Sequence, residues 1–206
     1  MSEFTAGSLT LLSNKPTVTN FNPTYIRDLN EKWFVFMTED TFVNENLPDC
    51  VREISRGVPV LYFYNFEDHF WGYRVVHQGQ EVAHAYVSYE LKDTLICDLA
   101  AERYPDEDTI ELLYVDTKGK NIYHQLEQEV KVTSAYQEAI FNQFASSNVD
   151  QFRLFHIDED RIAQLKHILS VNYLNALELI HTLVDEFKSL IQIEQMSWIS
   201  SDQVNE

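Results

Sequence analysis

Apolar and polar residues alternate with a period of two from Val58 onward, which is the pattern of β-strands. The alternation predicts three consecutive strands, Val58–Phe66, Phe70–His77 and Glu81–Tyr89. The dipeptide Gln78–Gly79 has the length and composition of a hairpin turn. Because links this short join antiparallel neighbours, we expect an antiparallel meander at the centre of the fold.

The segments outside the meander predict mainly helices. Pro48 suits the first turn of a helix, Asp93 suits an N-cap, and Ser134 with Gln137 fits a capping box. The other expected elements are strands over Leu9–Leu12 and Lys32–Met37, a helical turn over Thr24–Leu29, and helices over Pro48–Arg56, Asp93–Arg103 and Ser134–Ala145.

Two segments are ambiguous. Residues 109–132 show no sustained period: Thr109–Val115 favours a strand, and the residues after it fit a helix or a strand. Phe152–Ile157 fits one more strand or a linker to the helical end of the chain.

The C-terminal third predicts a long amphipathic helix, after a shorter one that Asp158 can cap. Apolar residues recur there every three or four positions: Tyr173, Leu177, Ile180, Val184, Phe187 and Ile191. The apolar face must be covered, either by the sheet of the same chain or by another protein. The second alternative leaves room for a homo-oligomer formed through this helix.

These elements predict an α+β fold, with an antiparallel sheet around residues 58–89, helices packed on it and a helical C-terminal third. We expect a single domain over residues 1–206. The alternative is a sheet-containing unit over 1–150 and a helical unit over 151–206.

The charge of the chain limits its partners. Its 206 residues include 33 acidic and 15 basic ones, a net charge of −18 that is spread over both halves of the sequence. Such a field repels phosphate backbones, so direct nucleic-acid binding is not expected. The charge serves either solubility or the docking of a basic partner.

The sequence also argues against a membrane or secreted protein. No stretch approaches the roughly 20 apolar residues that span a bilayer. The first residues include Glu3 and lack the basic residues of a signal peptide, and Cys50 and Cys97 have no metal or redox spacing. We therefore expect a soluble cytoplasmic protein with reduced thiols.

No pattern of catalytic residues stands out. The five glycines are scattered, which excludes the glycine-rich loops that bind phosphates, and the serine motif G-x-S-x-G is absent. His69 and His84 fall about 13 Å apart at roughly 3.3 Å per residue, too far to share a metal ion. We therefore assign no catalytic residue, metal or cofactor, and enzymatic activity stays uncertain and less favoured.

The strongest candidate site is one face of the predicted hairpin. Strict alternation about the turn places Trp71, Tyr73, His84 and Tyr86 on the same face. Aromatic rings with polar tips often line binding surfaces, so these four residues are the predicted binding residues. The alternative is that the rings only cover the sheet or pack beneath the N-terminal loop.

Three functions follow from these observations. The leading hypothesis is a non-catalytic, acidic cytosolic protein that binds another macromolecule, with a basic protein as partner, as an inhibitor or immunity-type factor does. The second is an enzyme of unknown class whose site combines scattered residues such as Tyr73 and His84. The third is a self-associating structural protein.

Overall fold

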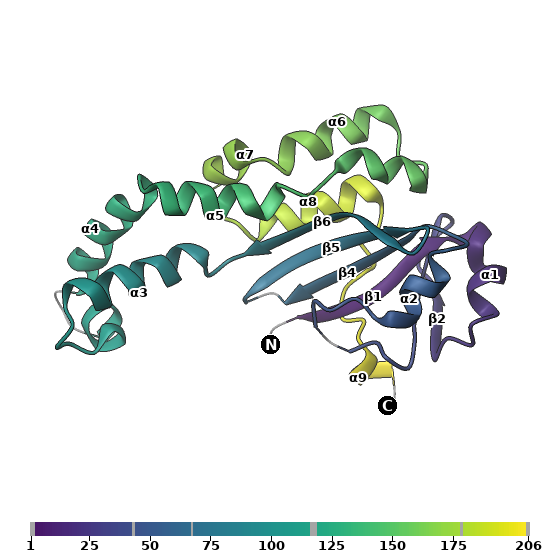
Figure 1. Cartoon of the computed structure of the whole chain (residues 1–206), viewed down its shortest axis with the longest axis horizontal. Helices are drawn as coiled ribbons and strands as arrows, with labels where there is room; N and C mark the ends of the chain where they lie inside the picture. The colour runs from purple at the N-terminus through teal and green to yellow at the C-terminus, as the bar shows by residue number, and fades with distance from the viewer. Residues whose placement is uncertain (1–2, 43, 67, 116–118, 178, 205–206) are drawn as a thin grey trace. The chain divides into compact units, whose positions relative to one another are not determined.

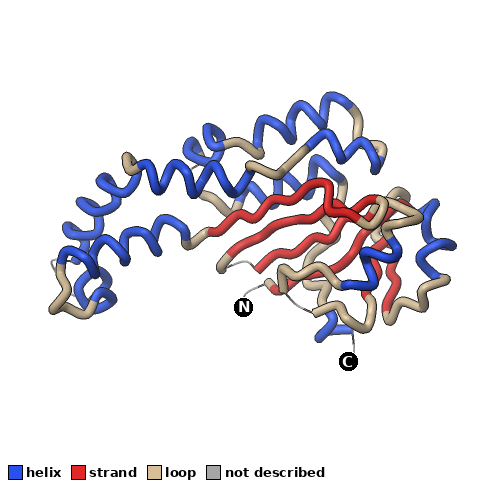
Figure 2. The backbone as a smooth tube through the Cα atoms, viewed as in Figure 1, coloured by secondary structure: helices blue, strands red, loops and turns tan. Residues whose placement is uncertain are grey.

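The computed structural model describes residues 3–42, 44–66, 68–115, 119–177 and 179–204. The chain divides into two compact units. Unit 1 comprises residues 1–87 and 143–206, so the C-terminal helices belong to the same unit as the sheet, and unit 2 comprises residues 88–142. Apart from Ser88 at the end of β6, the described strands lie in unit 1, whereas unit 2 is helical (Figure 2).

Unit 1 is built on a six-stranded antiparallel sheet with the strand order β2-β3-β1-β4-β5-β6 (Figure 1). The fold class is therefore α+β, as predicted. The strands are β1 (Phe4–Leu11), β2 (Tyr25–Asp28), β3 (Trp33–Met37), β4 (Val60–Phe66), β5 (Phe70–His77) and β6 (Gln80–Ser88). The predicted two-residue turn joins β5 to β6, with positive φ at both Gln78 and Gly79, as a type I′ hairpin turn requires.

One face of the sheet packs against helix α8 (Thr182–Ile191) and a 3₁₀ helix, η3 (Val149–Phe155). The ring of Phe187 stacks on Tyr73 at 5.0 Å and on Phe63 at 6.2 Å, and it also contacts Trp71. The apolar residues of α8 are buried, so the chain covers this helix itself, which was the first of the two alternatives.

The opposite face packs against α2 (Asp49–Ile54) near the β3 end of the sheet (Figure 1). Val51 and Ile54 of this helix meet Phe34, Phe36 and Val60. Asp40 holds the start of α2, because its carboxylate accepts from the Cys50 amide at 3.0 Å. Burial alone would raise the pKa of Asp40. Hydrogen bonds from the Thr38 side chain and from nearby backbone amides, including that of Cys50, outweigh the effect of burial and bring the pKa below its usual value.

Three predicted elements are wrong. Residues predicted as a helical turn at 24–29 form strand β2, because they pair with β3. The predicted strand Thr109–Val115 contains a π-helix, Glu111–Val115. The expected long C-terminal helix is two helices, α7 (Val171–Ala176) and α8, and Leu177 between them is extended.

The remaining short elements of unit 1 complete its frame. Phe152–Ile157 lies mostly in η3, so it is neither the strand nor the plain linker considered above. Asp158 caps the next helix as predicted, accepting from the Arg161 amide at 2.9 Å. The helix that Asp158 caps is α6 (Glu159–Ile168). The other short helices of unit 1 are η1 (Leu12–Asn14), α1 (Lys15–Thr19) and α9 (Ser201–Val204).

Unit 2 consists of α3 (Leu91–Arg103), the π-helix η2 (Glu111–Val115), α4 (Gly119–Lys131) and most of α5 (Ser134–Phe144). The helices α3 and α4 lie side by side (Figure 2). Their shared core is small; its buried members are Ile96, Ala100, Leu113, Leu126 and Val130.

Candidate functional site

Four aromatic rings form a row across one end of the sheet, on the face opposite α8. The ring centroids of Phe4 in β1 and Phe66 in β4 lie 5.5 Å apart, and those of Phe66 and Phe70 in β5 lie 4.8 Å apart. Phe70 in turn contacts Tyr86 of β6 at 5.0 Å. Both pairs that involve Phe66 are direct cross-strand partners. We call these four residues the aromatic row.

The two ends of the aromatic row reach solvent. The exposed fractions are 43% for Phe4 and 39% for Tyr86, whereas Phe66 in the middle is nearly buried. Towards the centre of the same face, Tyr64 and Tyr62 continue the line of rings. The Tyr62 hydroxyl donates to the Asn44 carbonyl at 2.9 Å, so the loop before α2 covers the centre of this face while the ends of the row stay open.

The two central tyrosines are structural. Burial raises the pKa of both Tyr62 and Tyr64 well above the ordinary value, so their hydroxyls stay protonated at physiological pH. They can donate hydrogen bonds but cannot act as bases there.

A charged group lies next to the row on β5 and β6. Arg74 bonds to one carboxylate oxygen of Glu81 at 2.7 Å, and the other oxygen lies 2.9 Å from Nδ1 of His84. Arg74 Nε also donates to the Glu45 carbonyl at 3.1 Å. Burial lowers the pKa of Arg74, but the hydrogen bond and charge of Glu81 outweigh it and raise that pKa. The imidazole of His84 is therefore held by a carboxylate that is itself fixed.

A pocket of about 400 Å³ lies beside His84 at the edge of the sheet. The backbone amide of His84 donates to the Ser146 carbonyl, and the Asn148 side chain donates to the Val82 carbonyl, each at 2.8 Å. These bonds pair the free edge of β6 with residues 146–148. Glu81, His84, Ser146 and Asn148 thereby line one pocket.

The four predicted binding residues do not share a face. Trp71 and Tyr73 are fully buried against Phe187, and the Tyr73 hydroxyl donates to the Ser147 carbonyl at 2.8 Å. Tyr86 contacts Phe70, which precedes Trp71 in the strand and therefore points to the opposite face. For Trp71 and Tyr73 the alternative interpretation, that they cover the sheet, is the correct one.

The error arises from a break in the alternation of β6. Glu81 and His84 are three positions apart, which in a regular strand places their side chains on opposite faces. Their side chains nevertheless bond to each other. The strand therefore changes phase by one residue between these positions, as at a β-bulge, and His84 and Tyr86 move to the face of the aromatic row.

Sequence reasoning missed Phe4, Phe66, Phe70, Arg74 and Glu81 as parts of this region. The pair Phe66 and Phe70 carried a signal, because these residues flank the β4–β5 link and must face each other in an antiparallel hairpin. Phe4 carried none, since its place depends on the pairing of β1 with β4, which are about 55 residues apart in the sequence.

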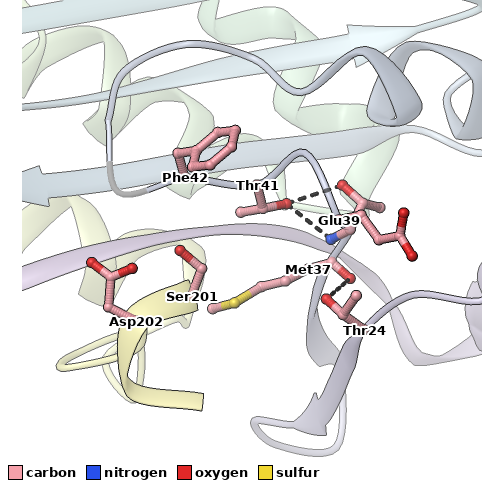
Figure 3. Close-up of a pocket in the computed structure, with 8 residues that line it drawn as sticks. Thr24, Met37, Glu39, Thr41, Phe42, Ser201 and Asp202 are labelled. Atoms are coloured by element: carbon pink, nitrogen blue, oxygen red, sulfur yellow. Dashed lines mark hydrogen bonds between the residues drawn. The ribbon is translucent and has the colours of Figure 1, made fainter. Parts of the chain in front are cut away.

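A second pocket, of about 200 Å³, lies between the loop after β3 and helix α9. Figure 3 shows Glu39 and Asp202 on opposite sides of it. The hydroxyls around it bond within the protein: Thr41 Oγ1 accepts from the Thr38 amide at 2.9 Å, and Thr24 Oγ1 donates to the Met37 carbonyl at 3.2 Å. Ser201 and Phe42 complete the lining. These bonds explain the hydroxyls as loop structure.

We also searched the part of the chain that the structure describes for metal sites, disulfides and membrane-spanning helices. There, no three His, Cys, Asp or Glu side chains gather closely enough to hold a metal ion, and both cysteines are free thiols. Among the described helices, none combines the length and the apolar character needed to cross a bilayer. Comparison with models of protein families finds no match, and neither does comparison with curated proteins or with solved structures.

Proposed function

We propose that this protein acts without catalysis, by binding a protein partner through the aromatic row and the adjoining Arg74–Glu81–His84 group. The observation that carries the proposal is the row itself: rings from four strands in contact, with Phe4 and Tyr86 open to solvent. Exposed aromatic rings contribute more binding energy per residue than most other side chains.

The rigidity of the row supports this function. Its members stand on four strands of one sheet, and Phe66 and Phe70 are fixed as a direct cross-strand pair. Side chains held in place before binding lose little conformational entropy when a partner docks. The row therefore has the properties of a recognition surface on a rigid scaffold.

The charge of the chain supports a basic partner. A net charge of −18 attracts a positively charged protein and accelerates its encounter. Aromatic faces also accept lysine and arginine through cation–π contacts. An inhibitor or immunity-type factor for a basic protein fits these properties, and the free thiols fit a cytoplasmic site of action.

The test uses variants of the row with a matched control. Tagged wild-type protein, the double variant Phe4→Ala/Tyr86→Ala and the variant Phe21→Ala are used to capture partners from cell lysate. Phe21 lies outside the row and is 40% exposed, close to the values of the two row residues. We expect one specific partner to bind the wild type and Phe21→Ala, and the double variant to bind it at least about tenfold more weakly.

Salt dependence completes this test. Binding should weaken as the salt concentration rises, because long-range attraction between charges is screened. Equal capture by the double variant and the wild type contradicts the assignment to the aromatic row. Binding that does not respond to salt contradicts the electrostatic part.

A second candidate function is catalysis in the pocket beside His84. The observation that favours it is the 2.9 Å contact between Nδ1 of His84 and the carboxylate of Glu81, which orients the imidazole in a pocket that Ser146 also lines. Hydrolysis of small aryl esters by the wild type, compared with His84→Gln, tests this function. Equal rates for the two proteins exclude a catalytic role for His84 in that reaction.

A further inference from the structure

Unit 2 exposes three apolar residues at its π-helix. Ile110, Tyr114 and Val115 have exposed fractions between 52% and 71%. Ile110 immediately precedes the π-helix, and Tyr114 and Val115 follow it by four and five positions, so the three residues lie about one helical turn apart. Leu113 points into the core of the unit. We call Ile110, Tyr114 and Val115 the π-turn patch.

Tyr114 of the π-turn patch packs against the rest of unit 2. The Tyr114 ring packs on Tyr123 at 5.9 Å, and its hydroxyl lies 4.0 Å from the Cys97 sulfur. A Cβ added to Gly119 would lie 2.4 Å from the Leu112 carbonyl oxygen, so the start of α4 approaches the π-helix as closely as only glycine permits. π-helical turns are rare and occur frequently at functional sites.

Exposed acidic side chains precede and flank the patch in the sequence. Six exposed acids fall between residues 98 and 111: Asp98, Glu102, Asp106, Glu107, Asp108 and Glu111. None of them makes an ion pair with another residue of the described chain. Arg103 is the one base in this stretch, and Glu129 binds its guanidinium through two bonds of 2.6 and 3.0 Å.

The charge of the chain is therefore denser in unit 2. Residues 88–142 contain 12 acidic and five basic residues, a net charge of −7 over 55 positions. The rest of the chain carries −11 over 151 positions. A division of the sequence into halves hides this difference, because unit 2 lies across the middle.

We propose that the π-turn patch is the docking site for a cationic amphipathic segment of a partner protein. The apolar side chains of the segment cover Ile110, Tyr114 and Val115, and its lysines or arginines face the flanking carboxylates. A second copy of the chain is disfavoured, because it brings the same negative charge. A nucleic acid is disfavoured for the same reason, and a metal ion does not cover apolar surface.

This inference rests on the proposed function, because both need a protein partner. The two proposals concern different surfaces, the aromatic row of unit 1 and the π-turn patch of unit 2. The probe is a synthetic peptide of leucine and lysine of about 18 residues, or five helical turns, with its leucines on one face. A second peptide has the same composition in an order that spreads the leucines. Binding of each to the full chain is measured by titration calorimetry at several salt concentrations.

One double variant changes the patch itself and another changes the flanking acids Glu107 and Glu111, and each has a control in unit 2. We expect Ile110→Ser/Val115→Ser to bind the amphipathic peptide about tenfold more weakly, whereas Val132→Ser, at an exposed apolar position outside the patch, binds as the wild type does. We expect Glu107→Gln/Glu111→Gln to weaken binding and reduce its salt dependence, whereas Glu138→Gln leaves both unchanged. Circular dichroism checks that every variant folds, and Val115→Ser alone replaces the double variant if that one does not.

Several results overturn this inference. Equal affinity for the two peptides, with no effect of Ile110→Ser/Val115→Ser, shows general charge attraction only. A drop in the mass of the peptide-free protein on Ile110→Ser/Val115→Ser, measured by light scattering, identifies a second copy as the occupant. Loss of peptide binding in Phe4→Ala/Tyr86→Ala moves the peptide to the aromatic row, which refutes the patch and leaves the proposed function standing.

The reverse result is equally distinct. The peptide binds through the patch as expected in this case, but Phe4→Ala/Tyr86→Ala captures the partner as well as the wild type does. That result refutes the role of the aromatic row in the proposed function and supports the patch.

Discussion

The two units of the chain are stabilised in different ways. Unit 1 buries large aromatic side chains on both faces of its sheet, among them Trp33, Tyr62, Trp71, Tyr73 and Phe187. Unit 2 buries a small aliphatic core and joins α3 to α4 with ion pairs. Apolar burial responds little to salt and pH, whereas ion pairs respond to both. The comparison predicts that solution conditions change unit 2 first.

This contrast extends to the surfaces. The exposed aromatic row of unit 1 stands on a rigid sheet, whereas the π-turn patch of unit 2 lies in a stretch of the sequence rich in exposed acidic residues. Under the two proposals, the rings of unit 1 slow the dissociation of a partner, and the denser charge of unit 2 accelerates the encounter of its own partner segment.

The largest effect is expected from Phe187→Ala in unit 1. Phe187 contacts Phe63, Trp71, Tyr73 and Phe152, so its removal leaves a cavity at the centre of the core. We expect the free energy of unfolding to fall by about 3–5 kcal/mol. All three tryptophans of the chain lie in unit 1, so urea denaturation followed by tryptophan fluorescence reports on this unit alone.

The matched control for this variant is Phe141→Ala, because Phe141 is an exposed phenylalanine of unit 2. It should leave the fluorescence midpoint in place. A similar shift for both variants contradicts the central role of Phe187.

The next effect is expected from Leu126→Ala, which tests whether the units unfold separately. Leu126 lies in the core of unit 2 with Ile96, Leu113 and Val130. We expect its truncation to destabilise unit 2 by about 2–3 kcal/mol while the tryptophan midpoint stays the same. Hydrogen exchange of the α3 and α4 amides measures the loss, and Val132→Ala, at an exposed position, is the control. A joint shift of both readouts would falsify independent unfolding.

The sequence predicts the local parts of this fold well. The meander, the Gln78–Gly79 turn and strand β3 depend on neighbours in the sequence, and all of them form. The two C-terminal helices were predicted as one, because their apolar residues continue a single period, although α8 buries its apolar face and α7 buries no residue. Periodicity predicts an amphipathic face, but it shows neither how deeply each residue is buried nor whether the helix is continuous.

The candidate site was less predictable, for a physical reason. A phase change of one residue in β6 moves every later side chain to the other face, and no glycine or proline between Glu81 and His84 signals it. Strict alternation therefore grouped the buried Trp71 with the exposed Tyr86. The higher charge density of unit 2 could not be predicted either, because only the fold shows that residues 88–142 form a separate unit.

The smallest of the expected effects comes from the ion pairs of unit 2, and it sharpens the comparison through pH. Glu127 accepts from Lys92 at 2.8 Å and from Lys131 at 3.1 Å, and His124 lies 3.6 Å from it. The hydrogen bonds from the two lysines lower the pKa of Glu127 to about 2. The unfolded chain has a glutamate pKa of about 4.3, so the folded state favours the ionised form.

Because the pKa of Glu127 is lower in the folded state, its contribution to stability is present above about pH 5 and is lost as the pH falls towards about 2. We expect Glu127→Gln to lower the stability of unit 2 at neutral pH by about 1 kcal/mol, as removal of an ion pair near the surface typically does. The variant should also lose less stability than the wild type between pH 5 and 2, and Glu138→Gln should behave as the wild type. Amide exchange of α3 and α4 at each pH measures both effects, while the tryptophan signal follows unit 1 in the same samples. The pair of lysines does not support α4 if Glu127→Gln and the wild type lose stability in parallel on acidification. In that case the small apolar core holds unit 2, and the proposed difference between the units does not exist.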